Sequence, residues 1–226
     1  MRSTTWRSGR KHRVAVALAL LAVIMSGCTA LSDNEAAQEV PTPDGDLYAA
    51  PEPLAHGDPG ELIWAEQVDL PIQPPATIWR ILYHSRTRLG TDVAVSGFAF
   101  VAKAKAPSGG RPVQAWAHGT VGLGDQCAPS KSLEDSFPPY GETLLRGGVI
   151  VATDYQGLGP PDEPGTAGAD VGQDVLDSVR AVAELPGVGK IGDVVLAGHS
   201  QGGAAALFAA ELAKSYAPEL KINATA

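Results

Sequence analysis

Two stretches in the first half of the chain alternate between apolar and polar positions. They are residues 77–87 (TIWRILYHSRT) and 93–103 (VAVSGFAFVAK), and the segment RLGTD separates them. Alternation with a period of two is typical of β-strands, and a short turn between two such runs indicates a β-hairpin. Residues 61–70 are a further strand candidate. His84 lies on the first arm, and we expect its side chain at the surface.

After residue 110 continuous apolar runs replace the alternation, and they indicate buried strands at 112–119, 149–155 and 193–199. Helical patterns alternate with these runs, at 142–148, 168–187 and 201–216. This order predicts an α/β fold: a mostly parallel sheet with an N-terminal antiparallel hairpin and helices on both faces. Residues 220–226 read as a strand that has just begun, so we expect the sheet to be incomplete at the C-terminus.

The N-terminus has the pattern of an export signal. Five basic residues and no acidic ones occur in residues 1–28, and residues 14–25 are an apolar run. Such a run is too short to span a membrane and has the length of a signal-peptide core. The segment MSGC then ends at Cys28, and small residues before a cysteine resemble a bacterial lipobox. We therefore expect an exported protein, either anchored to the cell envelope by a lipid on Cys28 or secreted after an ordinary signal.

Residues 29–60 are rich in Ala, Pro, Asp and Glu, and we interpret them as a flexible tether between that anchor and a domain at 61–226. Residues 29–226 carry 12 basic and 25 acidic side chains. Such an acidic body argues against nucleic acid as a partner, so the expected membrane contact is the lipid anchor alone. Cys127 has no second cysteine to pair with if Cys28 carries lipid.

The stretch VLAGHSQGGAAALFAA, residues 195–210, carries the candidate chemistry. Gly198, His199, Ser200, Gln201 and Gly202 fit the G-x-S-x-G nucleophile elbow, between an apolar strand and a small-residue helix. Such a turn presents the serine as a nucleophile, and the two glycines let it close. The alternative is a turn that only packs helix on strand, but that turn does not require a serine. The side chain of His199 points away from its neighbour Ser200 and is expected to support the elbow.

The second element is a strand that ends in His118 and opens a glycine-rich loop. An α/β-hydrolase places its second oxyanion donor in such a loop, while the first is the backbone N–H after the nucleophile, here Gln201. The second donor is either Gly119 or Thr120. The alternative is an ordinary turn beside a core histidine.

Four segments together resemble the secretory lipase family of α/β-hydrolases: HGTVGLGDQCAPS, RGGVIVATDYQGLG, LDSVRAVAELPGVG and LAGHSQGGAAALFAA. The resemblance covers roughly residues 61–226. It implies a Ser-Asp-His triad, no metal and no cofactor, and action on lipid esters or small esters. It assigns the nucleophile to Ser200 and the oxyanion donors to Gln201 and Thr120. It also implies that Asp154 supports a loop near the site.

The triad acid and base follow the serine in this fold, but the sequence after Ser200 has no histidine and no aspartate. The five histidines, at positions 12, 56, 84, 118 and 199, all precede it. We therefore expect a C-terminally truncated lipase or esterase with weak or no activity. The alternatives are another serine hydrolase, such as a thioesterase or peptidase, and a lipid-anchored binding protein without catalysis.

Overall fold

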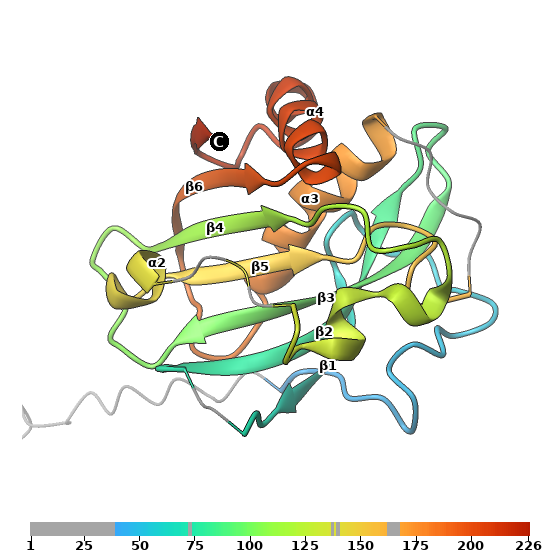
Figure 1. Ribbon diagram of the computed structural model, residues 1–226, viewed down its shortest axis with the longest axis horizontal. Coiled ribbons are helices and arrows are strands. Elements are labelled where there is room, and N and C mark those ends of the chain that lie inside the picture. The colour runs from blue at the N-terminus through green and yellow to red at the C-terminus, as the bar shows by residue number, and fades with distance from the viewer. Residues whose placement is uncertain (1–38, 72–73, 137, 139–140, 162–167) are drawn as a thin grey trace, which may run out of the picture. The chain divides into compact units, whose positions relative to one another are not determined.

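The computed structural model describes residues 39–71, 74–136, 138, 141–161 and 168–226. A seven-stranded sheet with strand order β1-β2-β3-β5-β4-β6-β7 organises them (Figure 1). The strands are β1 (Leu62–Val68), β2 (Ala76–Arg86), β3 (Asp92–Ala102), β4 (Arg111–Ala117), β5 (Val149–Thr153), β6 (Ile191–Gly198) and β7 (Ile222–Thr225). The helices are α2 (Gly141–Leu145), α3 (Ala169–Val182) and α4 (Gln201–Tyr216), with short 3₁₀ turns η1 (Asp125–Cys127) and η2 (Pro129–Ser132).

The antiparallel part of the sheet consists of β1, β2 and β3, and β3 also pairs antiparallel with β5. The expected hairpin is therefore confirmed. His84 differs from the expectation, because its side chain is buried and not at the surface. Its Nδ1 lies 2.9 Å from an oxygen of Asp92 on β3, and residues 57–61 pass over it, with Gly60 donating to its carbonyl oxygen at 2.7 Å. The segment before β1 thus covers a face that the alternation alone left open.

The parallel part consists of β5, β4, β6 and β7, as the apolar runs predicted. Thr153 of β5 pairs with Ala117 of β4, and Ala117 pairs with Gly198 of β6. These three strands therefore end at the same level of the sheet. The loops that follow them meet at the carboxyl edge, where open α/β sheets carry their sites.

Helices cover both faces of the sheet, as predicted. One apolar cluster joins α3 and α4 to one face, through side chains such as Val175, Val179 and Ala205. A second cluster on the other face includes Leu144 of α2, Leu133 next to η2, and Phe100 of β3. Valines recur every four residues along α3 at positions 171, 175 and 179, and they form the apolar stripe that packs against the sheet. Among the described helices, none is long and apolar enough to cross a membrane.

Residues 39–60 differ from the flexible tether that their composition suggested. Leu47 and Tyr48 are buried against Leu82 and Ala94. Trp64 Nε1 donates a hydrogen bond to the carbonyl oxygen of Leu47 at 2.7 Å, and the Tyr48 hydroxyl lies 2.8 Å from Ser130 Oγ. Two apolar side chains in a polar segment are enough to hold it on the domain. The predicted signal, Cys28 and residues 29–38 lie outside the described residues.

This docking predicts the effect of Tyr48→Phe. The change keeps the ring in place and removes only the hydroxyl group that faces Ser130. We expect the free energy of unfolding to fall by about 1 kcal/mol, the usual net value of one buried hydrogen bond. Urea denaturation followed by tryptophan fluorescence measures it, and an unchanged midpoint would mean that the segment does not hold this position.

Candidate active site

Ser200 occupies the turn between β6 and α4. Its backbone has φ 56° and ψ −118°, and among the described non-glycine residues only Tyr155 shares a positive φ. A serine in this sparsely populated region is strained by about 1–3 kcal/mol, and such strain is concentrated at functional sites. Ser200 is exposed at the carboxyl edge of the sheet, and α4 begins at the next residue. This is the strand-turn-helix geometry of the predicted elbow.

The two flanking glycines are required by close backbone approaches. A Cβ atom at Gly198 would overlap the carbonyl oxygen of Gly202, and a Cβ at Gly202 would overlap the carbonyl oxygen of Ala117 on β4. The first approach closes the turn on itself, and the second packs the start of α4 on the neighbouring strand. Because both obstructing atoms belong to the backbone, neither overlap can be relieved by a side-chain rotation.

We therefore expect Gly202→Ala to lower the free energy of unfolding by about 3 kcal/mol, because the elbow must shift away from β4. Gly203→Ala is the matched control. Its Cβ would meet nothing nearer than the carbonyl oxygen of Gly198 at 3.7 Å, and alanine favours the helix by up to about 1 kcal/mol. Thermal denaturation of both variants checks this, and equal effects would contradict the close approach.

The loop after β4 lies beside the elbow. A Cβ atom at Gly119 would be 3.3 Å from His199 Nδ1 and 3.7 Å from Ser200 Cβ. Thr120 Oγ1 donates a hydrogen bond to Gln201 Oε1 at 3.0 Å. The structure thus brings together Ser200 and the residues predicted as oxyanion donors, Gln201, Thr120 and Gly119. Their donor roles, and the choice between Gly119 and Thr120, remain predictions.

His118 is held by the loop that follows β5. Its Nε2 lies 3.1 Å from the carbonyl oxygen of Asp154, and its Nδ1 lies 2.6 Å from the carbonyl oxygen of Gly119. Its ring packs on that of Tyr155 with the centroids 4.3 Å apart, and the Tyr155 hydroxyl donates to the carbonyl oxygen of His118 at 3.0 Å. Both ring nitrogens thus face backbone oxygens, which suits a residue that shapes the loop.

Asp154 is a fully buried carboxyl group that joins three parts of the chain. Its oxygens accept hydrogen bonds from Ser96 Oγ of β3 at 2.5 Å, from the backbone N–H of Ser130 at 2.9 Å, and from Ser130 Oγ. Burial raises the pKa of this carboxyl group, while the bonds from the two serines oppose that rise. The arrangement fits the loop-supporting role that the resemblance implied.

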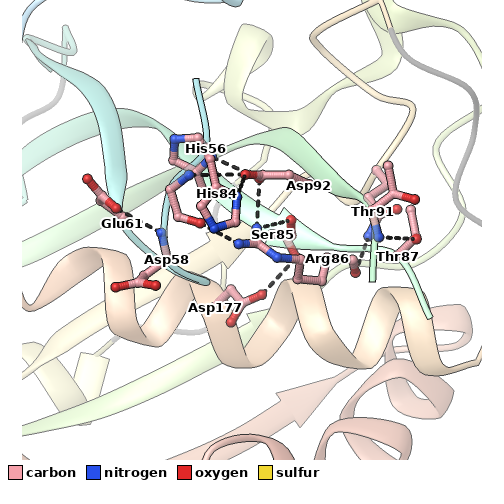
Figure 2. Close-up of polar contacts among 12 residues, drawn as sticks. His56, Asp58, Glu61, His84, Ser85, Arg86, Thr87, Thr91, Asp92 and Asp177 are labelled. Atoms are coloured by element: carbon pink, nitrogen blue, oxygen red, sulfur yellow. Dashed lines mark hydrogen bonds and ion pairs between the residues drawn. The ribbon is translucent and has the colours of Figure 1, made fainter. Parts of the chain in front are cut away.

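His56 and His84 lie near the turn that joins β2 to β3. Figure 2 shows His56, His84 and Arg86 converging on Asp92. The nearest atoms of His56, His84 and Arg86 are 3.4, 2.9 and 2.7 Å from the Asp92 carboxylate. Burial acts to raise the pKa of Asp92, but the bonds from His84 and Gly57 and the charge of Arg86 outweigh it and lower the pKa. Within the described part of the chain, no hydrogen bond joins a histidine ring to Ser200.

Sequence reasoning missed a second buried polar network beneath the loop after β5. Asp174 and Asp177 of α3 have no exposed surface, and Ser85 of β2 lies between their carboxyl groups. Their partner Ser85 lies 89 and 92 positions earlier in the chain, so the helical pattern around the two acids gave no signal of this network. Among the described residues, no group of three or more His, Cys, Asp or Glu side chains could hold a metal ion.

Comparison with known proteins identifies relatives. Residues 140–226 match the family model described as secretory lipase. A probable inactive lipase of Mycobacterium tuberculosis is 27% identical over 79% of this chain and 43% of its own length. Lipase A of Moesziomyces aphidis is 28% identical over 92% of this chain and 47% of its own length. The chain thus spans about half the length of these curated relatives.

Solved structures share the fold. Candida antarctica lipase A in its closed state aligns with a TM-score of 0.63 and 24% identity, over 80% of this chain and 45% of that chain. The rice cell wall degrading esterase LipA from Xanthomonas oryzae, in a ligand-bound form, aligns with a TM-score of 0.57 and 20% identity, over 75% of this chain and 50% of that chain. The α/β-hydrolase architecture expected from the sequence is therefore confirmed.

Proposed function

We propose that the protein hydrolyses carboxylic esters, with lipid esters as its preferred class and Ser200 as the nucleophile, because residues 140–226 match the secretory lipase family model. One observation supports this most strongly: the strained backbone of Ser200 between two glycines that admit no side chain. The lipases among its relatives support ester hydrolysis as the reaction. The same geometry would serve a thioesterase or a peptidase, so the ester class rests on the family.

The reaction would proceed by acyl transfer through Ser200. Its Oγ attacks the ester carbonyl carbon and gives its proton to a general base. The oxyanion that forms accepts hydrogen bonds from the backbone N–H of Gln201 and from that of Gly119 or Thr120. The carbon–oxygen bond to the alcohol then breaks, the alcohol leaves with a proton, and water hydrolyses the acyl-enzyme.

None of His56, His84 and His118 serves as that base in this proposal, so the Ser200 proton passes to water. The first two bind Asp92 at the hairpin, and both ring nitrogens of His118 face carbonyl oxygens. A serine hydroxyl without a base is a poor nucleophile, and the oxyanion hole alone gives only a small part of the rate. We therefore propose slow hydrolysis by residues 39–226.

A second candidate function is ester or lipid binding without catalysis. It is favoured by the similarity to a relative named as a probable inactive lipase, and by the lack of a described histidine bonded to Ser200. The oxyanion loop and the elbow would then form a recess that holds an ester carbonyl without cleaving it.

Hydrolysis of p-nitrophenyl butyrate separates the two functions. We expect the wild-type protein to release p-nitrophenol slowly, and Ser200→Ala to remove at least nine-tenths of that rate. Ser215→Ala is the control, because this serine lies on the same helix with its hydroxyl bonded to the carbonyl oxygen of Leu212. Equal rates for wild type and Ser200→Ala would reject the catalytic function and favour binding.

We also propose that the protein is exported and held at the membrane by a lipid on Cys28. The family is named for secretion, and the N-terminal pattern of residues 1–28 supports the lipid. Expression of the wild type and Cys28→Ser, followed by detergent phase separation, tests this. The wild type should enter the detergent phase and Cys28→Ser should not. Wild-type protein found only in the aqueous phase would leave secretion as the better proposal.

A further inference from the structure

Asp174 and Asp177 share a single hydroxyl hydrogen. Ser85 Oγ lies 2.8 Å from Asp174 Oδ1 and 2.8 Å from Asp177 Oδ2, and all three side chains are buried. Figure 2 shows Ser85 on β2 reaching Asp177 on α3. Because a serine hydroxyl has one hydrogen, it can donate fully to only one of two carboxylates. The second short contact needs another hydrogen, which must come from one of the acids.

The remaining partners show which acid holds that proton. Asp177 receives a hydrogen bond from the guanidinium group of Arg180 at 2.8 Å and another from the Tyr216 hydroxyl at 2.8 Å. Among the described residues, Asp174 receives only amide hydrogens besides its contact with Ser85, from the Gln156 backbone at 3.0 Å and the Gln156 side chain at 2.8 Å. The positive charge of Arg180 favours an ionised Asp177, so the extra proton belongs on the Asp174 carboxyl group. Asp174 then donates a hydrogen bond to Ser85 Oγ, and Ser85 donates its own hydrogen to Asp177.

Burial raises the pKa of Asp174 to about 7; its bonds with Gln156 and Ser85 act against the rise, and the charge of Asp177 adds to it. Other ionisable groups face this network from every side. Burial raises the pKa values of Tyr83, Tyr155 and Tyr216, so these phenols stay neutral. Burial also raises the pKa of Asp177, and its bonds with Tyr216, Ser85 and Arg180 oppose that rise. Arg180 is the cation that contacts Asp177, and the buried carboxyl group of Asp154 acts on Tyr83.

Contacts lead from Asp174 to the oxyanion loop. The backbone N–H and the side-chain amide of Gln156 both donate hydrogen bonds to Asp174, and Gln156 follows Tyr155 in the chain. Tyr155 packs on the His118 ring and donates to the His118 carbonyl oxygen, and His118 bonds to the carbonyl oxygen of Gly119. The Tyr83 hydroxyl donates to Thr153 Oγ1 at 2.7 Å and contacts the Asp174 carbonyl oxygen at 3.0 Å, which ties the start of the same loop to α3.

We propose that Asp174, in its protonated form, is a positioning residue for the oxyanion loop at residues 118–120, acting through Gln156, Tyr155 and His118. The inference rests on the function proposed for Ser200. When Asp174 loses its proton, two buried carboxylates face each other with one hydrogen between them, and the new charge must draw in water. Ser85 lies in a strand and Asp177 in a packed helix, whereas Gln156 lies in a loop. We therefore expect the loop that contains Gln156 to change conformation, and not the strand or the helix.

Amide hydrogen exchange of the peptide covering residues 115–124 tests this without requiring activity. Wild type and Asp174→Asn are compared at pH 6 and pH 8.5, since asparagine keeps the shape and the hydrogen of the protonated acid. At pH 6 the two should exchange alike. At pH 8.5 the wild type should exchange about ten times faster than Asp174→Asn. Asp193→Asn, the same change at an exposed position on β6, should follow the wild type.

A second variant keeps the test valid if Asp174→Asn does not fold. Asp177→Asn removes the second carboxylate, so Ser85 can donate its one hydrogen to an ionised Asp174. The exchange of this variant at pH 8.5 should therefore be slower than that of the wild type. Exchange that is the same in all proteins at pH 8.5 overturns the inference. If p-nitrophenyl butyrate is hydrolysed while exchange does not depend on Asp174, only this inference fails. If exchange depends on Asp174 but Ser200→Ala does not slow hydrolysis, the proposed function fails and the loop has no catalytic role.

Discussion

Asp154→Ala is expected to lower the free energy of unfolding by about 3 to 4 kcal/mol. The alanine removes the acceptor for three buried donors, Ser96 Oγ, Ser130 Oγ and the Ser130 backbone N–H. The Ser130 N–H then loses its acceptor in a buried site, and an unpaired buried polar group costs about 1–3 kcal/mol. The two hydroxyl groups lose their carboxylate acceptor and keep only the Leu158 carbonyl oxygen, 3.4 Å from Ser96 Oγ, and the Tyr48 hydroxyl beside Ser130. The Ser130 hydroxyl also faces Tyr48, so the loss extends to the docked N-terminal segment.

Urea denaturation of three variants checks this expectation. Asp154→Asn keeps one carbonyl oxygen and the shape of the side chain, so its loss should be less than half that of Asp154→Ala. Glu142→Ala is the control, since it removes an exposed carboxylate paired with Arg146, a contact worth at most about 0.5 kcal/mol. If Asp154→Ala were as stable as Glu142→Ala, the buried bonds would contribute nothing to the fold.

The second large effect is a loss of stability as the pH rises. The pKa of Asp174 is raised to about 7 in the folded state, above its ordinary value of 3.8. Between these values the folded state binds more protons than the unfolded state, so the free energy of unfolding falls with increasing pH. At about 1.4 kcal/mol per pH unit, Asp174 alone accounts for a loss of about 4 kcal/mol between pH 4 and pH 7.

Asp174→Asn should remove this contribution. Its stability should equal that of the wild type near pH 4 and exceed it by up to about 4 kcal/mol at pH 8, since the amide cannot ionise. Thermal denaturation at pH 4, 6 and 8 measures the difference. Asp193→Asn should keep the wild-type slope between pH 5 and 8, because the bond from Lys221 lowers the pKa of Asp193 and keeps it ionised there. Parallel curves for wild type and Asp174→Asn would contradict the buried proton.

Much of the fold could be predicted because its signals are local. Alternation predicted β2 and β3, apolar runs predicted β4, β5 and β6, and valine spacing predicted α3. The elbow could also be predicted, since two glycines around a serine between strand and helix leave few other conformations. The register that brings the ends of β4, β5 and β6 to one level follows from parallel pairing.

The polar networks could not be predicted, because they join residues far apart in the chain. Ser85 and Asp174 are 89 positions apart, and Tyr48 and Ser130 are 82 apart. The composition around Tyr48 indicated a tether, since two apolar contacts have little weight in a polar segment. His84 was expected at the surface because alternation does not reveal which segment covers a strand. In each case the deciding partner comes from another part of the sequence.

Covalent labelling of Ser200 tests the central claim most directly. The protein is incubated with a fluorophosphonate, digested, and its peptides are examined by mass spectrometry. We predict an adduct on the peptide that contains Ser200, present in the wild type and Ser215→Ala and absent in Ser200→Ala. A wild-type protein that carries no adduct at Ser200, or that is labelled equally after Ser200→Ala, would contradict the assignment of Ser200 as the nucleophile.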